Sequence, residues 1–568
     1  MNRWHARRSA RARPVSAFIS QPEPRTIGSF ARGRQLVAGN FLFAGQLVED
    51  AEHSIWRLPH QSPVFDEEIQ GFAWLDDLAA VGDLNARQKS QAWLADWISL
   101  YGMGTGPGWT PDLTGRRLIR WINHAIFLLN GQDSDYSRAY YRSLAQQTIF
   151  LSRRWHTASA GLPRFEALTG LIYAGIALEG MESRVEPAMK ALARECVDQI
   201  DEEGGIPTRN PEELLEVFTM LNWAASALAE AGRMAAREHL AAIERIAPTL
   251  RALRHSDGGL ARFHGGGRGL EGRLDHALAS SGVKSAAPEG LSMGFARLHG
   301  GRTSVIIDVA RPPAGANSYN AHASTLAFEL TSGRRPLVVN CGSGVSFGPD
   351  WRRAGRATPS HTTLGIEGFS SSRLGPRKLV GGVEREILID TPKDVRVQFL
   401  KEDDFEGIIA GYDGYISTHG LTHIRRIDLS HSGRSLAGED TLAAIEKSDE
   451  KQFEKALDRS KLQGIAYQIR FHLHPDVDAE LDMGGTAVSM ALKSGEIWVF
   501  RHDGTARLSV DASVYLEKGR IKPRATKQVV LSGVTVEYAT RIRWTLAKAQ
   551  ETPNAVRDLE REDSTPLN

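Results

Sequence analysis

The chain contains very little cysteine. Cys196 and Cys341 are the only two among 568 residues, and they fall in segments with different hydrophobic patterns. This excludes a disulfide framework and fits a reducing compartment. We expect both side chains to be buried and to behave as small hydrophobic groups.

Long hydrophobic runs are missing as well. No stretch approaches the roughly 18 uninterrupted apolar residues of a membrane-spanning helix. The N-terminus is basic, but no apolar run of about 7 to 15 residues follows it, as a secretory signal requires. We therefore predict a cytoplasmic protein that does not bind a membrane, with a disordered basic arm over residues 1–25 and a disordered tail over 549–568.

An excess of charge of one sign is also absent. The 69 basic residues are balanced by 68 acidic ones, which gives a formal net charge of +1. There is no global field of the kind that attracts nucleic acid or an anionic membrane, so we expect no nucleic-acid partner. Any polyanion must be bound by a local group of residues.

The length argues for two or three domains. Between about residues 68 and 252 apolar residues recur at spacings of three and four, as in Leu168, Leu171 and Ile172, which predicts about seven helices stacked as antiparallel hairpins. After about residue 290 the pattern changes to the alternation typical of strands, which predicts a large β-sandwich.

Helices followed by strands indicate two separate architectures and not a wound α/β sheet. We predict an α+β multidomain protein with a helical domain over residues 26–255, a linker over 256–288 and an antiparallel β-sandwich over 289–548.

One block of residues, 317–367, resembles a known family. Its marks are His322, Phe328-Glu329, Gly342, Arg356 and His361. In this spacing the block is similar to the C-terminal domain of the heparinase II/III family of polysaccharide lyases. The resemblance extends over roughly residues 40–545 and implies an incomplete α/α toroid followed by a β-sandwich, with the sugar bound in a cleft between them.

The block also departs from the family pattern. Asn320 stands where the family usually has a histidine, and Asn340 stands where it usually has an aspartate. In the helical part the resemblance places Leu162 and Pro163 at the usual Asn-His, and Glu213 at the usual tyrosine. The fold is therefore easier to infer than the catalytic set.

A lyase that acts on a uronic acid needs three groups. One neutralises the carboxylate, one removes the proton at C5, and one protonates the oxygen that leaves C4. We predict Tyr319, Asn320, Arg209, Glu213 and Glu166 as the catalytic candidates.

Substrate contacts are predicted for Arg164, Arg356, His423 and Arg425. Arg164 and Arg209 stand near the starts of predicted helices, where the helix dipole attracts anions. His423 and Arg425 match a strand that borders the cleft in the family.

An ordinary structural reading remains open for the glutamates. In this alternative, Glu166 and Glu213 are residues of the first turn of a helix, where the helix dipole favours them, and Asn210 caps the helix that contains Glu213. On the sandwich side we expect Tyr319 and Asn320 to lie on an extended segment together with His322, where alternate residues share a face.

The resemblance also implies a structural zinc site formed by His322, Asn340 and His361. An amide oxygen is a poor zinc ligand beside a carboxylate, so the alternative is a hydrogen-bonded pair of histidines. No cofactor is required for the chemistry.

We therefore predict a lyase that cleaves an acidic, glycosaminoglycan-like oligosaccharide or polysaccharide by β-elimination. The alternatives are a glycoside hydrolase that pairs Glu166 with Glu213, and a non-catalytic glycan-binding or assembly protein. The oligomeric state stays open, with a homodimer as one alternative.

Overall fold

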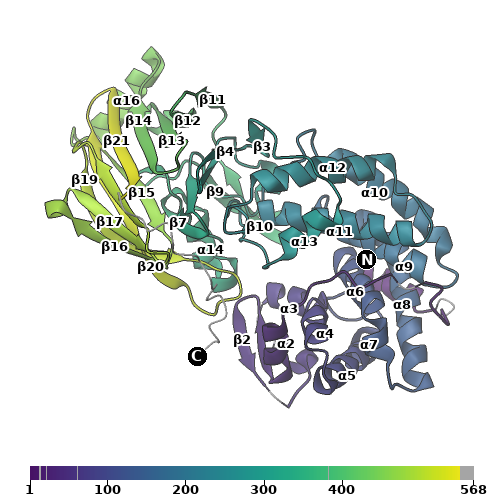
Figure 1. The fold of residues 1–568 in the computed structure, drawn as a ribbon. Coiled ribbons are helices and arrows are strands. Elements are labelled where there is room, and N and C mark those ends of the chain that lie inside the picture. The colour runs from purple at the N-terminus through teal and green to yellow at the C-terminus, as the bar shows by residue number, and fades with distance from the viewer. Residues whose placement is uncertain (12–14, 21, 51, 60–61, 381–382, 550–568) are drawn as a thin grey trace.

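The structure is a computed structural model that describes residues 1–568 apart from 12–14, 21, 51, 60–61, 381–382 and 550–568. A helical half is followed by a sheet half, as predicted (Figure 1). The α-helices of the first half are α1 (Asn2–Ser9), α2 (Phe30–Val37), α3 (Pro63–Gln70), α4 (Trp74–Val81), α5 (Leu84–Tyr101), α6 (Pro111–Asn123), α7 (Ala125–Leu129), α8 (Ser134–Arg154), α9 (Leu162–Ala177), α10 (Val185–Gln199), α11 (Pro211–Glu230), α12 (Arg237–Ala252) and α13 (Arg273–Ser280). No helix among the described residues is both long enough and apolar enough to cross a membrane.

The helices of the first half pack very closely at one point. A side chain on Gly115 of α6 would come within 2.3 Å of the Glu166 backbone oxygen in α9, and one on Gly170 would meet the backbone of Gly115 at 2.5 Å. Only glycine permits this approach of two backbones. The contact fixes α6 against α9, and these two helices carry an ion pair between Arg116 and Glu166.

Two antiparallel sheets form the second half. One has the strand order β11-β12-β13-β14-β21-β18-β17-β16, and the other has β19-β20-β15-β7-β6-β5-β4-β3, with β8 paired to β15. The strands of the first sheet are β11 (Val395–Lys401), β12 (Phe405–Tyr415), β13 (Leu421–Ser430), β14 (Ser435–Ala443), β16 (Val477–Asp482), β17 (Ala487–Leu492), β18 (Ile497–His502) and β21 (Ala539–Lys548). Those of the second are β3 (Leu291–Ser292), β4 (Phe295–Gly300), β5 (Thr303–Asp308), β6 (Phe328–Ser332), β7 (Arg335–Val339), β8 (Leu364–Ile366), β15 (Ile465–Leu473), β19 (Arg507–Tyr515) and β20 (Arg524–Thr535).

The inner faces of the sheets share one hydrophobic core. Trp544 stacks on Phe328 with ring centroids 5.8 Å apart, and Phe471 meets Trp544 edge-on at 4.8 Å. Such aromatic contacts stabilise the sandwich beyond the area they bury.

Smaller elements complete the chain. The remaining helices are α14 (Pro349–Arg356), α15 (Ile416–His419) and α16 (Lys447–Arg459), and the 3₁₀-helices are η1 (Ile55–Arg57), η2 (Trp155–Thr157), η3 (Glu182–Arg184), η4 (Gly315–Ser318), η5 (Val345–Phe347), η6 (Thr358–Ser360) and η7 (Met483–Gly485). Two hairpins stand apart from the large sheets: β1 (Asn40–Phe43) with β2 (Gln46–Glu49), and β9 (Arg373–Val380) with β10 (Val383–Ile389).

The N-terminal arm corrects an expectation. Residues 1–25 were predicted to be disordered, but α1 lies within them and packs on α8. Ala6 is fully buried, Gln146 donates to its carbonyl at 3.1 Å, and Arg154 donates to Asn2 at 2.9 Å. The basic composition of this segment gave no indication that α1 has a small buried face, formed by Ala6 and Ser9. The predicted linker 256–288 likewise contains α13, while residues 550–568 of the predicted tail lie outside the described residues.

Arg209 forms an ion pair and hydrogen bonds between the helical half and the sheet half. Arg209 precedes α11 in the helical half, and its guanidinium donates to Asp308 at the end of β5 at 2.6 Å. It also donates to the carbonyls of Met293, Gly294 and Arg311 at 3.0, 2.9 and 2.8 Å. Asp308 is fully buried. Because burial raises a carboxyl pKa, and Arg209 and His264 oppose this more strongly, the pKa of Asp308 lies well below its usual range.

Replacement of Arg209 by alanine is expected to destabilise the protein by about 3–5 kcal/mol, because it leaves the buried Asp308 carboxylate without its cation. Calorimetric or urea-induced unfolding measures the change. Arg138→Ala is a matched control, since its pair with Asp135 is exposed to solvent and contributes little. Equal stability of both variants would show that Arg209 does not hold the halves together.

Candidate active site at the junction of the two halves

The first turn of α11 brings acidic groups to the junction between the halves. The Asn210 side chain caps this helix by accepting hydrogen bonds from the backbone N–H groups of Glu212 and Glu213 at 3.0 and 3.2 Å. The capping role proposed for Asn210 is thus confirmed, and it fixes both glutamates at the helix N-terminus. Glu212 pairs with Lys518 from the loop between β19 and β20 and accepts from the Gly267 backbone at 2.8 Å.

The sheet half places a tyrosine and an arginine near these glutamates. Tyr319 follows η4, and the Arg385 guanidinium of β10 lies 4.1 Å from the centre of its ring. Such a contact is a favourable cation–π interaction. The extended segment expected here is not formed: Tyr319 has helical backbone angles and Asn320 lies in a bend. Hydrogen bonds from Arg352 to the Tyr319 carbonyl and the Asn320 side chain, both 3.0 Å long, hold this turn.

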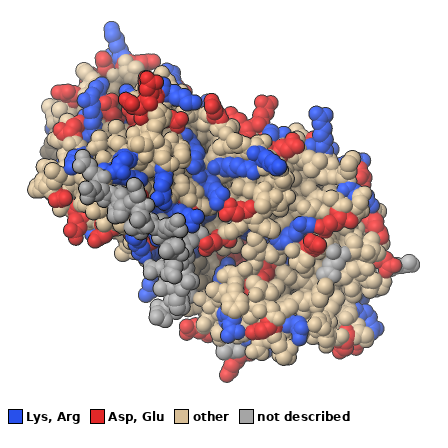
Figure 2. All heavy atoms as spheres, in the orientation of Figure 1, with Lys and Arg blue, Asp and Glu red and all other residues tan. Residues whose placement is uncertain are grey.

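We call Glu213, Tyr319, Arg385 and Lys518 the junction cluster. The pKa of Glu213 is raised by burial to about 7, although Lys518 and Arg385 oppose the change. Burial, reinforced by Glu213, raises the pKa of Tyr319 to about 12. At neutral pH the cluster thus has a carboxyl group that can take up a proton and a phenol that keeps its own. On the face drawn in Figure 2, Lys and Arg side chains gather along the boundary between the halves.

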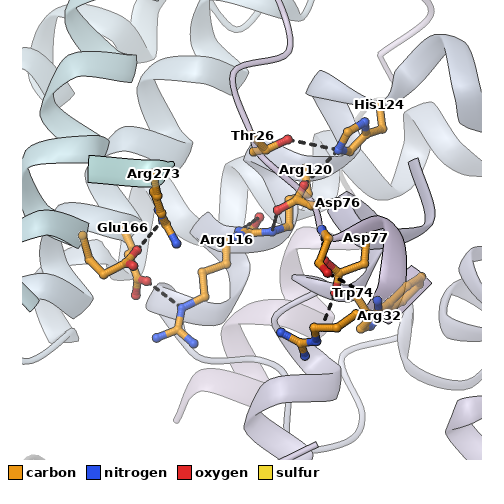
Figure 3. A network of polar contacts seen from close by, with 12 residues as sticks. Thr26, Arg32, Trp74, Asp76, Asp77, Arg116, Arg120, His124, Glu166 and Arg273 are labelled. Carbon is orange, nitrogen blue, oxygen red and sulfur yellow. Dashed lines mark hydrogen bonds and ion pairs between the residues drawn. The ribbon is translucent and has the colours of Figure 1, made fainter. Parts of the chain in front are cut away.

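Glu166 lies in the helical half with a different partner. Its Oε1 accepts from Nε of Arg116 at 2.7 Å, while its buried Oε2 has no partner among the described residues (Figure 3). Burial raises the pKa of Glu166 to about 7 in spite of Arg116. Arg164 is engaged elsewhere, because it donates to Glu195 of α10 at 3.0 Å and to the Ala158 carbonyl at 2.9 Å.

Arg356 is buried and holds neighbouring backbone segments of the site in place. It is 3% exposed, and its guanidinium donates to the carbonyls of Ser318, Ala321 and Glu386 at 2.8 to 2.9 Å. It thereby joins the turn before Tyr319 to strand β10. This burial disagrees with the predicted substrate contact and indicates a structural role. Arg209 is likewise taken up by the contact between the halves and is not free for catalysis.

His423 and Arg425 lie in the sandwich core. Both donate to Asp440 at 2.7 Å, and they are 0% and 2% exposed. Arg425 also donates to the carbonyls of Leu326 and Thr362, each at 2.8 Å. The prediction that His423 and Arg425 contact substrate does not agree with this burial. The sequence does not distinguish a strand residue that points into the core and pairs with an acidic residue from one that points into the cleft.

The structure brings His322 and His361 together as a hydrogen-bonded pair. Nδ1 of His361 donates to the Ala357 carbonyl at 2.9 Å, so its Nε2 is left to accept from Nδ1 of His322 at 3.0 Å. Two imidazoles on a tetrahedral zinc need nitrogens roughly 3.3 Å apart with no proton between them. The amide oxygen of Asn340 is already used, since it accepts from the Thr362 backbone at 3.0 Å.

These donors, as arranged here, do not fit a zinc ion. No cluster of three or more His, Cys, Asp or Glu suited to a metal occurs in the part of the chain that the structure describes. Burial lowers the pKa of His361 to about 4 and that of His322 well below its usual range, so both rings are neutral. The zinc site stays a prediction, and the geometry favours the alternative of a hydrogen-bonded pair.

Removal of metal is expected to leave the protein unchanged, because the histidine pair is already satisfied by hydrogen bonds. Thermal unfolding with and without a chelator, together with metal analysis of the purified protein, checks this. One zinc per chain, whose removal lowers the unfolding temperature, would instead establish the zinc site.

The fold and part of the sequence resemble those of known proteins. A helical toroid followed by an antiparallel sandwich is the architecture of heparinase-like proteins, and residues 283–545 match the family described as heparinase II/III-like, C-terminal. The sheet half of the chain is thus similar to the heparinase II/III-like C-terminal domain.

The chain is similar to particular proteins in sequence and in structure. The chain is 29% identical over 570 residues to FtsZ-localized protein C of Caulobacter vibrioides (strain NA1000 / CB15N), covering 96% of this chain and 92% of that protein. It superimposes on heparinase III with a TM-score of 0.67 at 12% identity, covering 96% and 89% of the two chains. A mutant of the heparan sulfate lyase HepC from Pedobacter heparinus gives 0.58 at 14% identity, covering 97% and 88%. At these identities the two structures establish the fold alone.

The sequence did not point to Arg385 or Lys518. Arg385 stands in a short hairpin and Lys518 in a turn, and neither belongs to a motif. Their proximity to Glu213 depends on how the hairpin and the β19–β20 loop fold over the junction. A scan for basic residues in loops near the end of the sandwich would have been the nearest available signal.

Proposed function

We propose that the protein is a carbohydrate-active enzyme that binds an acidic oligosaccharide at the junction cluster and cleaves it by β-elimination. The observation that carries this is that Arg385 lies over the Tyr319 ring and that Glu213 interacts electrostatically with Tyr319, Arg385 and Lys518. One carboxyl group with a pKa near 7, one protonated phenol and two cations are the groups that the reaction needs.

The roles follow from the charges. Arg385, together with Lys518, which also pairs with Glu212, neutralises the uronate carboxylate. This stabilises the negative charge that develops when C5 loses its proton. Ionised Glu213 takes that proton, and the C5–H electron pair becomes the double bond between C4 and C5. The bond from C4 to its oxygen breaks, and Tyr319 donates a proton to the departing oxygen.

Incubation with a panel of uronic-acid polymers is expected to produce the ultraviolet absorbance of an unsaturated uronate. Glu213→Gln should lower kcat/KM by at least about 100-fold, the usual size of a general-base contribution. Because Glu213 acts as a base only when ionised, kcat/KM should rise as the pH increases through about 7.

Glu186→Gln is the matched control, because Glu186 lies on the surface of α10 and, among the described residues, forms an ion pair with exposed Lys190. It should leave the rate unchanged. A Glu213→Gln variant as active as the parent would overturn the assignment. New reducing ends without absorbance would instead identify a hydrolase that uses Glu166 and Glu213.

A second candidate is a binding protein that acts where FtsZ assembles. It is favoured by the 29% identity over nearly the full length to a protein named for its localisation with FtsZ. It is also favoured by Leu162 and Pro163, which form the start of α9 where the family resemblance places Asn and His. A fold can be kept when its chemistry is not.

In this second reading the purified protein should sediment with FtsZ filaments from its own organism. The Glu213→Gln variant should sediment equally well, because binding does not depend on the acid–base groups. The same mixture without filaments is the control. If the protein pellets no more with filaments than without them, this candidate fails.

A further inference from the structure

The helical half contains a pocket that is separate from the junction cluster. Its wall is formed by the segment 25–32 and by residues of α4, α6, α11 and α13, and none of the junction-cluster residues lines it. Figure 3 shows Arg273 of α13 on one side and Asp77 with Arg32 on the other, with Arg120 and Asp76 between them. We call it the toroid pocket.

Four arginines line the toroid pocket, and all have hydrogen-bond donors to spare; the buried Nε of Arg25 has no partner among the described residues. Arg120 donates through Nε to Asp76 at 3.0 Å and through Nη1 to a backbone carbonyl. Arg273 donates through one nitrogen only, to Glu216 at 2.5 Å. Arg32 stands 3.6 Å from Asp77, too far for a hydrogen bond. Within the described part of the chain, their remaining guanidinium N–H groups donate no hydrogen bond to protein.

The charges around the toroid pocket are balanced. Arg25 and Arg273 pair with Glu230 and Glu216, which lie outside the lining. Arg32 and Arg120 face Asp77 and Asp76 within it. Four arginines thus meet four carboxylates. Such a site does not attract a dianion, but its free N–H groups can still bind a single carboxylate in a directed way.

Acceptors and an apolar wall complete the toroid pocket. Asp77 accepts one hydrogen bond, from the Ser29 backbone at 2.7 Å, and carboxylate oxygens have further capacity for hydroxyl donors. Asp76 is more fully used, by Arg120 and by His124 at 2.9 Å. Trp223, Leu270 and Ala277 supply apolar surface in the same lining. A concave site with an aromatic wall and a few converging polar groups is typical of small-ligand binding.

We infer that the toroid pocket binds a monosaccharide acid of the uronate type. Its carboxylate meets the spare guanidinium donors of Arg120 and Arg273, its hydroxyls meet Asp77 and Arg32, and its ring lies against the apolar wall that includes Trp223. This site is additional to the one at which we propose cleavage. It does not depend on lyase activity, because no residue is shared between the two.

Titration calorimetry with free glucuronate tests the inference on the full chain. We expect saturable binding that Arg273→Gln and Arg32→Gln each weaken by about tenfold or more, the effect of losing a hydrogen bond to a charged group. Glucose should bind at least about tenfold more weakly than glucuronate for the same reason. Arg34→Gln is the matched control for Arg32→Gln, because Arg34 lies on the same helix and pairs with exposed Asp83 outside the pocket.

Arg385→Gln separates this site from the junction cluster. The saturable binding that Arg273→Gln weakens should persist in this variant, whereas its loss would assign the sugar to the junction. The inference is overturned by absence of saturable binding, by equal binding of glucose, or by competition from inorganic phosphate at the same concentration. Circular dichroism and thermal unfolding confirm that each variant is folded, and a second variant, Asp77→Asn, replaces any that is not.

Discussion

The buried ion pair between Arg209 and Asp308 holds the two halves of the molecule in one arrangement. A carboxylate with no exposure to solvent is unstable without a cation, and the cation comes from the other half of the chain. Arg209 also donates to four backbone carbonyls of the sheet half, so its donors fix orientation as well as distance. Because Arg209 stands two residues before α11, the same contact places Glu213 at the junction, close enough to Tyr319 to raise the pKa of its phenol.

Several arginines that were predicted to bind a ligand instead stabilise the fold. Arg356 and Arg425 each donate to backbone carbonyls that no regular secondary structure satisfies, and Arg164 pairs with buried Glu195. A planar guanidinium with five donors can satisfy several acceptors at once, which is why it is suited to irregular buried segments. What is left for chemistry is the smaller set at the junction.

The junction cluster and the toroid pocket differ in how their charges are used. In the cluster, burial raises the pKa of Glu213 to about 7, an arrangement suited to proton transfer. In the pocket, every arginine has a carboxylate partner, which suits recognition of a ligand with little charge. The heparinase-like fold accommodates both, and it does not by itself decide whether the chain cleaves a glycan or binds one.

Hydrophobic periodicity was enough to predict helices followed by a sandwich, because burial imposes a period of 3.6 on helices and 2 on strands. The toroid arrangement of the helices was implied only by the family resemblance of the residues around His322 and His361. The sequence also placed Glu213 and Tyr319 among the catalytic candidates. Only the tertiary structure showed that Arg356 and Arg425 are buried and that Arg385 reaches Tyr319. Periodicity records which face of an element is covered, whereas contacts between distant segments depend on how those faces dock, and no local pattern encodes that.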